Sequence, residues 1–289
     1  MTLSDMLELL IQGLTLGGLY GLVGAGLALN FGVLKVVNLV HGELITCGGF
    51  IAAFCLSMVP NMPFPLILVL AMAGTALVGA GLQALVVERA MTTRDPMVTM
   101  LVTFGLGIVA RNVMVELFGA DLRGLDVGGL SHARLQIGTV SVGVLPVITF
   151  AFALAAFATL HVLVNMTAFG RAVRATSDRP DIARLMGVRV RTLHIKVAAL
   201  AAALAALAGM LLAMRASISP YSGVERLIVA FEVVVLGGVG SIRGALIAGL
   251  VLGIAQVVTA RFDGNAGLLY VHLTFLAGLG LRAFRGKLS

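Results

Sequence analysis

The sequence predicts an all-α fold, that of a polytopic membrane protein with about eight transmembrane helices and a glycine-broken half-membrane or re-entrant segment. Of the 289 residues, 60% are hydrophobic and only 11% are charged, and the mean hydropathy is +1.08. A soluble domain carries roughly 25% charged residues. Because so few charges are available to cover a surface in water, most of the surface must face lipid or protein.

Long apolar runs recur along the whole chain, and a spanning helix needs roughly 20 such residues. The longest polar stretch, 167–194, is too short for a separate soluble domain. We therefore expect one transmembrane domain over residues 1–289. The expected spans are Leu7–Val33, Leu39–Met58, Pro63–Val87, Pro96–Phe118, Val140–Asn165, Ile195–Ala216, Leu227–Ala260 and Leu268–Ala283.

The seventh run, Leu227–Ala260, is too long for one crossing. Gly237, Gly238 and Gly240 interrupt it, and the part before them is too short to cross alone. Irregular backbone at membrane depth is tolerated only where it is packed in protein or lines a cavity. The glycines are not followed by Gly-Lys-Ser/Thr, so they do not form a Walker A loop for nucleotide phosphates.

Small residues at four-residue spacing occur in the first and seventh runs. Gly17 and Gly21 form one such pair, and Gly249 and Gly253 another. This spacing lets helices approach closely in lipid. We expect a tight bundle.

Charge predicts the orientation. The stretch 167–194 holds six arginines against two aspartates, so it is expected to be cytoplasmic. That places the N-terminus and 119–137 outside and Glu88–Asp95 in the cytoplasm. Eight simple crossings would leave the basic C-terminal end outside, so we expect the glycine-broken segment to add one crossing and return that end to the cytoplasm. The basic residues concerned are Arg282, Arg285 and Lys287.

A short helix is expected inside this cytoplasmic stretch. Ser177 and Asp178 are capping residue types, Pro180 suits a first helical position, and Gly187 suits the residue just past the end. About two turns fit between them.

The side chains of this short helix are amphipathic. Ile182, Leu185 and Met186 share one face, while Asp181 and Arg184 are charged. A short isolated helix is marginal in water, so the apolar face needs a partner. Either the stretch only sets topology, or its helix is a coupling element that docks on a soluble ATPase.

A polar group stands at the junction of the first two apolar runs, at Asn38, His41, Gly42 and Glu43. Ionisable groups near the membrane are costly and often functional. One alternative is structural, with Asn38 and His41 bonding to backbone groups freed where a helix breaks at Gly42. The other is direct contact with a substrate. Metal binding is not expected, because zinc requires three or four ligands.

Glu232 is a carboxylate within an apolar run. It is either an interfacial group near the outer surface, or it lines a substrate path or pairs with Arg243. In the fourth run, Arg111 and Glu116 are expected to anchor at the outer interface, and Asn112 to bond with Glu116 four residues on.

No nucleophile–base spacing, ATP-binding motif or basic–aromatic patch for nucleic acid occurs. We expect no catalytic residue and no directly bound cofactor. If the protein moves a solute against a gradient, the energy must come from a partner or from an ion gradient.

Three blocks of sequence resemble one known family from about Gly13 to about Phe284. They are residues 13–20 leading to 38–43, residues 170–172 through 183–187, and residues 236–241 with 244–245. In order and spacing, they resemble the permease subunit of branched-chain amino-acid ABC importers.

The resemblance implies a bacterial inner-membrane importer. A second homologous permease completes the pore as a hetero- or homodimer, two cytoplasmic ATPases bind and hydrolyse ATP, and a periplasmic binding protein delivers substrate. The residues that would pass ATPase motion to the spans lie in the short cytoplasmic helix and the glycine after it.

The chain departs from the family's usual residues at three places. Glu232 replaces an apolar residue, Arg111 a glutamine, and the C-terminal end differs. An importer of urea, amides or small aromatic or carboxylic acids is therefore an alternative. A third class is an ion-coupled secondary transporter that uses His41, Glu43 or Glu232.

Overall fold

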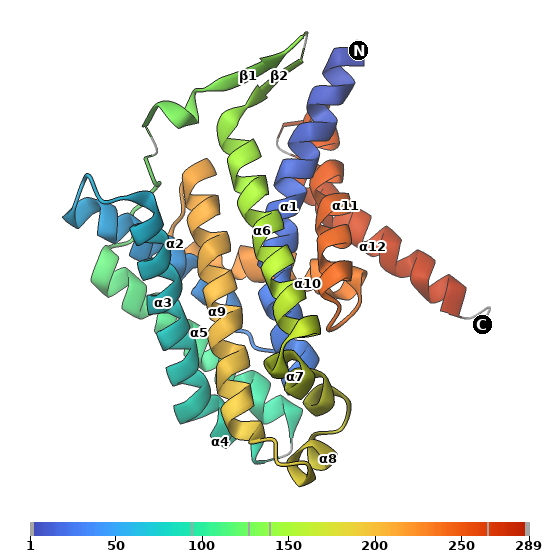
Figure 1. Cartoon of the computed structure of the whole chain (residues 1–289). Helices are drawn as coiled ribbons and strands as arrows, with labels where there is room; N and C mark the ends of the chain where they lie inside the picture. The colour runs from blue at the N-terminus through green and yellow to red at the C-terminus, as the bar shows by residue number, and fades with distance from the viewer. Residues whose placement is uncertain (1–2, 94, 127, 139, 265, 287–289) are drawn as a thin grey trace.

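A computed structural model describes residues 3–93, 95–126, 128–138, 140–264 and 266–286 as a bundle of helices (Figure 1). Within these residues, eight helices are long and apolar enough to cross a membrane. The N-terminus and a small β-hairpin lie at one end of the bundle, and α4 (Glu88–Met91), α7 (Ala168–Asp178) and α8 (Pro180–Leu185) lie at the other. The predicted all-α membrane fold is confirmed.

The long helices follow the apolar runs. They are α1 (Leu3–Leu34), α2 (His41–Met58), α3 (Phe64–Leu82), α5 (Pro96–Phe118), α6 (Val144–Met166), α9 (Val190–Arg215), α11 (Ile242–Ala260) and α12 (Gly267–Gly286). The shorter elements are the π-helix Gln83–Val87, α10 (Gly223–Gly237), the strands β1 (Arg134–Ile137) and β2 (Val140–Gly143), and 3₁₀ turns at Gly128–Ser131 and Pro220–Ser222.

Helix α9 is the centre of the bundle. In its most apolar stretch 83% of residues are buried, against 11% in α12. It packs against α1, α2 and α3, and its small residues allow this. A Cβ added to Gly48 of α2 would lie 2.6 Å from the Ala206 Cβ, closer than real side chains approach.

The glycine pairs of α1 and α11 face one another. A Cβ added to Gly249 would meet Gly21, and one added to Gly253 would meet Gly17 and the Gly13 carbonyl. The close approach predicted from the four-residue spacing therefore occurs between these two helices.

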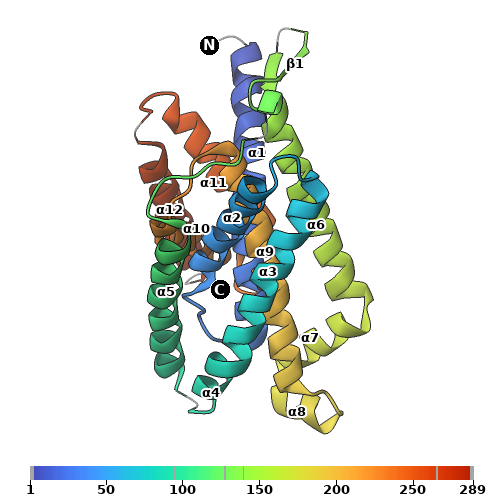
Figure 2. The ribbon, with the colours of Figure 1, turned by 90° about the vertical axis from the view of Figure 1, so that its left-hand side faces the viewer.

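The long seventh run contains two helices, as predicted. At about 1.5 Å per residue, α10 is roughly 22 Å long, shorter than the roughly 30 Å of a hydrocarbon core. The link to α11 contains Gly238 and Gly240, with φ of +93° and +77°, a region that favours glycine. Helix α10 lies near mid-height (Figures 1 and 2), and α11 then returns along α1.

The end of α12 lies beside α10. Arg282 Nη1 donates a hydrogen bond to the Val235 carbonyl at 3.1 Å. Helix α12 starts near the hairpin end and runs obliquely away from the bundle, and its last described residues lie near mid-height (Figure 1). The cytoplasmic C-terminal end stays a prediction. Lys287 lies outside the described residues.

The expected boundary at Val140 was wrong. Residues Val140–Gly143 form β2, antiparallel to β1 with Ile137 opposite Val140, and the span begins at Val144. Alternating valines suit a strand as well as a helix start. The Glu8 carboxylate accepts a hydrogen bond from the Ser141 N–H at 2.6 Å and so ties the hairpin to α1.

Two boundaries at the end that holds α8 also differ. Residues Glu88–Met91 are helical and continue α3 through the π-helix, although the expected span ended at Val87. Helix α9 begins at Val190, earlier than the expected Ile195. In both places charged residues extend a helix beyond its apolar part, which hydropathy does not detect.

Candidate functional site

The chain is irregular between α1 and α2. Helix α1 ends at Leu34, and Lys35 has a positive φ of 57°. Helix α2 begins at His41, so the prediction of a break at Gly42 was wrong, because the break precedes it. A Cβ on Gly42 would lie 2.8 Å from the Leu227 Cβ and would clash with the Gly223 carbonyl. Gly42 thus lets α10 approach α2.

Asn38 bonds to a backbone group at this break, whereas His41 bonds to a backbone group inside α1. The Asn38 Oδ1 accepts from the Val40 N–H at 3.2 Å. The fully buried His41 places Nε2 3.3 Å from the Val23 carbonyl of α1. Buried backbone groups must find such partners. The contact of Asn38 matches the structural alternative, whereas His41 ties α2 to α1 away from the break.

Glu43 is buried and paired with Arg111 of α5. The Arg111 Nε and Nη2 donate to the Glu43 Oε1 at 3.1 and 2.5 Å. The side chains are 26% exposed for Arg111 and 4% for Glu43. The expected role of Arg111 as an interfacial anchor is replaced by this pair, which joins α2 to α5. Asn112 bonds to the Ile108 carbonyl at 2.8 Å and not to Glu116.

Glu232 is also buried, at 5% exposure, so its carboxylate does not reach the surface of this chain. Its Oε1 lies 2.5 Å from the Nδ1 of His272 on α12. The suggested partner Arg243 is exposed instead. One oxygen of each carboxylate, Glu43 Oε2 and Glu232 Oε2, has no hydrogen-bond partner within the described residues.

Helix α10 connects the two buried carboxylates, because it contacts Glu43 and carries Glu232. It packs against α1, α2, α11 and α12. Its first residue, Gly223, touches the carboxylate of Glu43, where a Cβ would clash, and Glu232 lies further along the same helix. A movement of α10 would therefore act on both buried pairs.

A third polar cluster was not predicted. Asn30, His41 and Gln83 line a cavity of about 10 Å³ between α1, α2, α3 and α9. The Gln83 Nε2 donates to Glu88 at 3.1 Å, and Glu88 lies 3.2 Å from the His194 Nδ1. Isolated Asn30 and Gln83 within apolar runs were the available signal, but nothing local indicates that they meet.

Helices α7 and α8 lie at the opposite end from the hairpin (Figure 2). Ser177 does not cap α8 as expected. It belongs to α7, and its Oγ donates to the Gly32 carbonyl of α1 at 2.6 Å. Asp178 is the last residue of α7, and Arg179 occupies the cap position of α8 without a side-chain hydrogen bond. The proline at position 180 starts α8.

Helix α8 ends in a Schellman motif. Gly187 has a φ of +85°, and its N–H donates to the Arg184 carbonyl at 3.0 Å. The Val188 N–H donates to the Ala183 carbonyl, also at 3.0 Å. These bonds satisfy carbonyls that the helix leaves free, so the short helix has a defined end.

The apolar face of α8 points outward. Leu185 is 86% exposed, Met186 80% and Ile182 49%. Asp181 and Arg184 form an exposed pair at 3.4 Å beside them. Large apolar side chains gathered at an exposed tip mark an interaction surface.

The fold, the buried pairs of Glu43 and Glu232, and the exposed apolar face of α8 together define a polytopic membrane protein with an apolar tip outside the spans. The chain belongs to the branched-chain amino acid transport system / permease component family, whose model matches residues 9–278. It is a transport permease, and the predicted family is confirmed.

Relatives of this family align over nearly the whole chain. The high-affinity branched-chain amino acid transport system permease protein BraD of Pseudomonas aeruginosa is 26% identical and is covered over 93% of both chains. The corresponding LivH protein of Escherichia coli K12 is 26% identical over 89% of this chain and 86% of its own. A solved structure, PsaBC from Streptococcus pneumoniae in complex with Fab, is matched with a TM-score of 0.48 at 14% identity, over 94% of this chain and 90% of that one.

Proposed function

We propose that this chain is a pore-forming subunit of an ATP-driven importer for branched-chain or related amino acids in a bacterial inner membrane. Its partners are a second homologous permease, two cytoplasmic ATPases that carry the ATP, and a periplasmic binding protein. The observation that carries the proposal is the exposed apolar tip of α8, together with the names of the relatives.

The contacts of α7 offer a path from α8 to the membrane interior. Ser177 holds α7 to the Gly32 carbonyl at the end of α1. A Cβ on Gly32 would lie 2.9 Å from the Gly240 Cα, so Gly32 also touches the link between α10 and α11. In the proposed mechanism, ATPase closure displaces α8 and α7, and Gly32 and Gly240 pass the displacement to α10. Such rigid-element coupling needs no chemistry in the membrane.

The buried pairs supply groups of both charges for a zwitterion. Arg111, the more exposed member of its pair, suits a substrate carboxylate, and the free oxygens of Glu43 and Glu232 suit an ammonium group. Both oxygens are buried here, so substrate access requires α10 to move.

Uptake by the whole complex in proteoliposomes tests the function. Labelled leucine, isoleucine and valine should accumulate only when ATP is present on the side of the membrane that holds the ATPases and the binding protein is present on the other side. Uptake of labelled urea, short amides or benzoate, without uptake of leucine, would favour the alternative substrates. Uptake by the lone chain, driven by an ion gradient, would contradict the proposal.

A further inference from the structure

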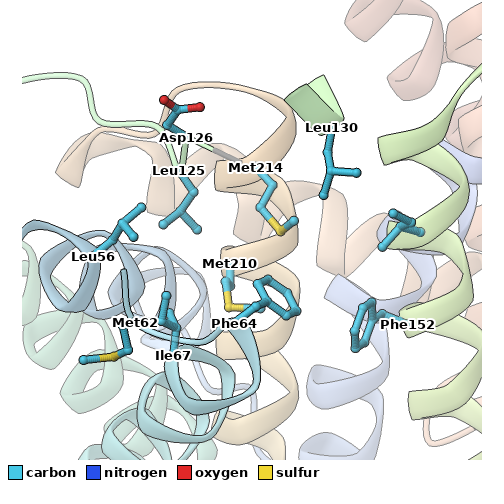
Figure 3. Close-up of a pocket in the computed structure, with 11 residues that line it drawn as sticks. Leu56, Met62, Phe64, Ile67, Leu125, Asp126, Leu130, Phe152, Met210 and Met214 are labelled. Atoms are coloured by element: carbon cyan, nitrogen blue, oxygen red, sulfur yellow. The ribbon is translucent and has the colours of Figure 1, made fainter. Parts of the chain in front are cut away.

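An apolar groove lies between α3 and α6 and is also lined by residues of α9; Figure 3 shows its upper part. Its upper part has a volume of about 400 Å³ and is lined by Leu56, Phe64, Phe152 and Met214 among others. The lower part, of about 230 Å³, shares Phe152 and continues toward the α8 end. The two parts are neighbours that share Phe152 as a lining residue, and we refer to them together as the channel.

Few side chains that line the groove can form a hydrogen bond with water. The polar residue that lines the upper part is Asp126, and the one that lines the lower part is Thr159. The Thr159 Oγ1 already donates to the Ala155 carbonyl at 2.8 Å. Water needs two to four polar partners to stay in a cavity. An apolar occupant therefore fits the channel below Asp126.

The charge of the groove lies at one end. Asp126 belongs to the segment between α5 and the hairpin, which is expected on the outer side, and its carboxylate stands at the rim (Figure 3). One oxygen accepts from the Gly128 N–H at 2.8 Å, which fixes the carboxylate in place. A molecule that matches has a cationic head at the interface and an apolar chain directed toward the membrane centre.

We propose that this groove binds one acyl chain of an amine-headed phospholipid, such as phosphatidylethanolamine, with Asp126 against its ammonium group. The groove lies in the spans, where acyl chains are the surrounding solvent. Asp126 favours an amine over an anionic head. Three of the four helices that carry the buried pairs, α5, α10 and α12, lie on another side of the bundle (Figure 2), whereas α2 carries Glu43 and also contributes Leu56 to the groove wall.

Lipid retention by the purified assembly tests the site. The protein is delipidated, then given phosphatidylethanolamine or phosphatidylglycerol at equal amounts, and bound lipid is counted by native mass spectrometry. We expect a preference for phosphatidylethanolamine. Asp126→Asn should reduce it by about threefold, the size of an exposed ion pair. Asp121→Asn, exposed in the same segment but away from the groove, should leave it unchanged.

A second pair of variants tests the channel itself. Ala156 lines the lower part, whereas Ala158 of the same helix is exposed elsewhere. Ala156→Phe should lower retention of both lipids by roughly tenfold because it blocks several methylene positions, and Ala158→Phe should not. Equal retention by these two variants would overturn the proposal. So would a photocross-linker at Ala156 that captures a second polypeptide in place of lipid.

Discussion

Glu43 and Glu232 each lie in the bundle against one nitrogen group from a distant helix. Glu43 has Arg111, and Glu232 has His272. A carboxylate in an apolar interior is costly unless it is paired. Each buried carboxylate is therefore tolerated because its partner is present. Removal of the partner alone should destabilise the protein more than removal of both members of the pair.

Arg111→Met should destabilise the protein more than the double change Glu43→Gln with Arg111→Met. The single change leaves a buried carboxylate without its cation, which costs about 3 kcal/mol for a fully buried pair and less here because Arg111 is partly exposed. Thermal unfolding in detergent measures both. A double variant no more stable than Arg111→Met would show that the pair contributes little.

Glu232→Gln should reduce transport more than Glu116→Gln. Glu232 is buried on α10 against His272, whereas Glu116 is exposed on α5. We expect a loss of about fivefold for Glu232, which corresponds to about 1 kcal/mol, the net contribution of one hydrogen bond, and little change for Glu116. The measurement is ATP-dependent uptake at matched protein levels. Similar small effects at the two positions would assign Glu232 a purely structural role.

At the scale of the element, α8 presents its apolar face outside the spans. Leu185→Glu should reduce uptake to about a tenth or less, because a buried interface contact would become an unpaired charge. Leu122→Glu makes the same change at a residue that is 71% exposed at the other end, and it should transport normally. Membrane insertion is checked for both. Normal uptake with Leu185→Glu would exclude the coupling role.

The contact of α1 with α11 depends on glycine. Gly253→Ala would place a Cβ against Gly17, and we expect a loss of about 1–3 kcal/mol in stability from overpacking. Gly81→Ala in α3 meets nothing within 4 Å and should be neutral or stabilising. Thermal midpoints in detergent compare the two. A Gly253 variant as stable as the Gly81 variant would contradict this packing.

The spans could be predicted because hydrophobic length alone selects them, and the division of the seventh run followed from glycines at 237, 238 and 240. The strand Val140–Gly143 could not, because a short valine-rich stretch next to a span satisfies either structure. The helical turn Glu88–Met91 was missed because charged residues continue a helix without an apolar signal.

For the site, the sequence marks which residues are exceptional but not which ones meet. Glu43 and Glu232 stand out as charges in apolar runs. Their partners are 68 and 40 residues away, and such contacts depend on how the helices pack. Gly42 was misplaced for the same reason, because its role is set by α10 and not by its neighbours in sequence.

For the whole molecule, the central feature is that its exposed and buried regions are linked through a few contacts. The tip of α8 continues into α7, α7 bonds to the end of α1, and α1 touches the link that leads to α10. In the proposed function, the exposed tip is the place where a soluble ATPase docks. The proposed function therefore depends on whether the ATPases and the second permease bind this chain.

The most direct test is to purify the chain in mild detergent from its own host and identify stoichiometric companions by mass spectrometry. The account predicts ATPase subunits and a second permease, with the ATPases lost from the Leu185→Glu variant and retained by Leu122→Glu. Recovery of the chain alone, still able to transport in vesicles without ATP, would contradict it.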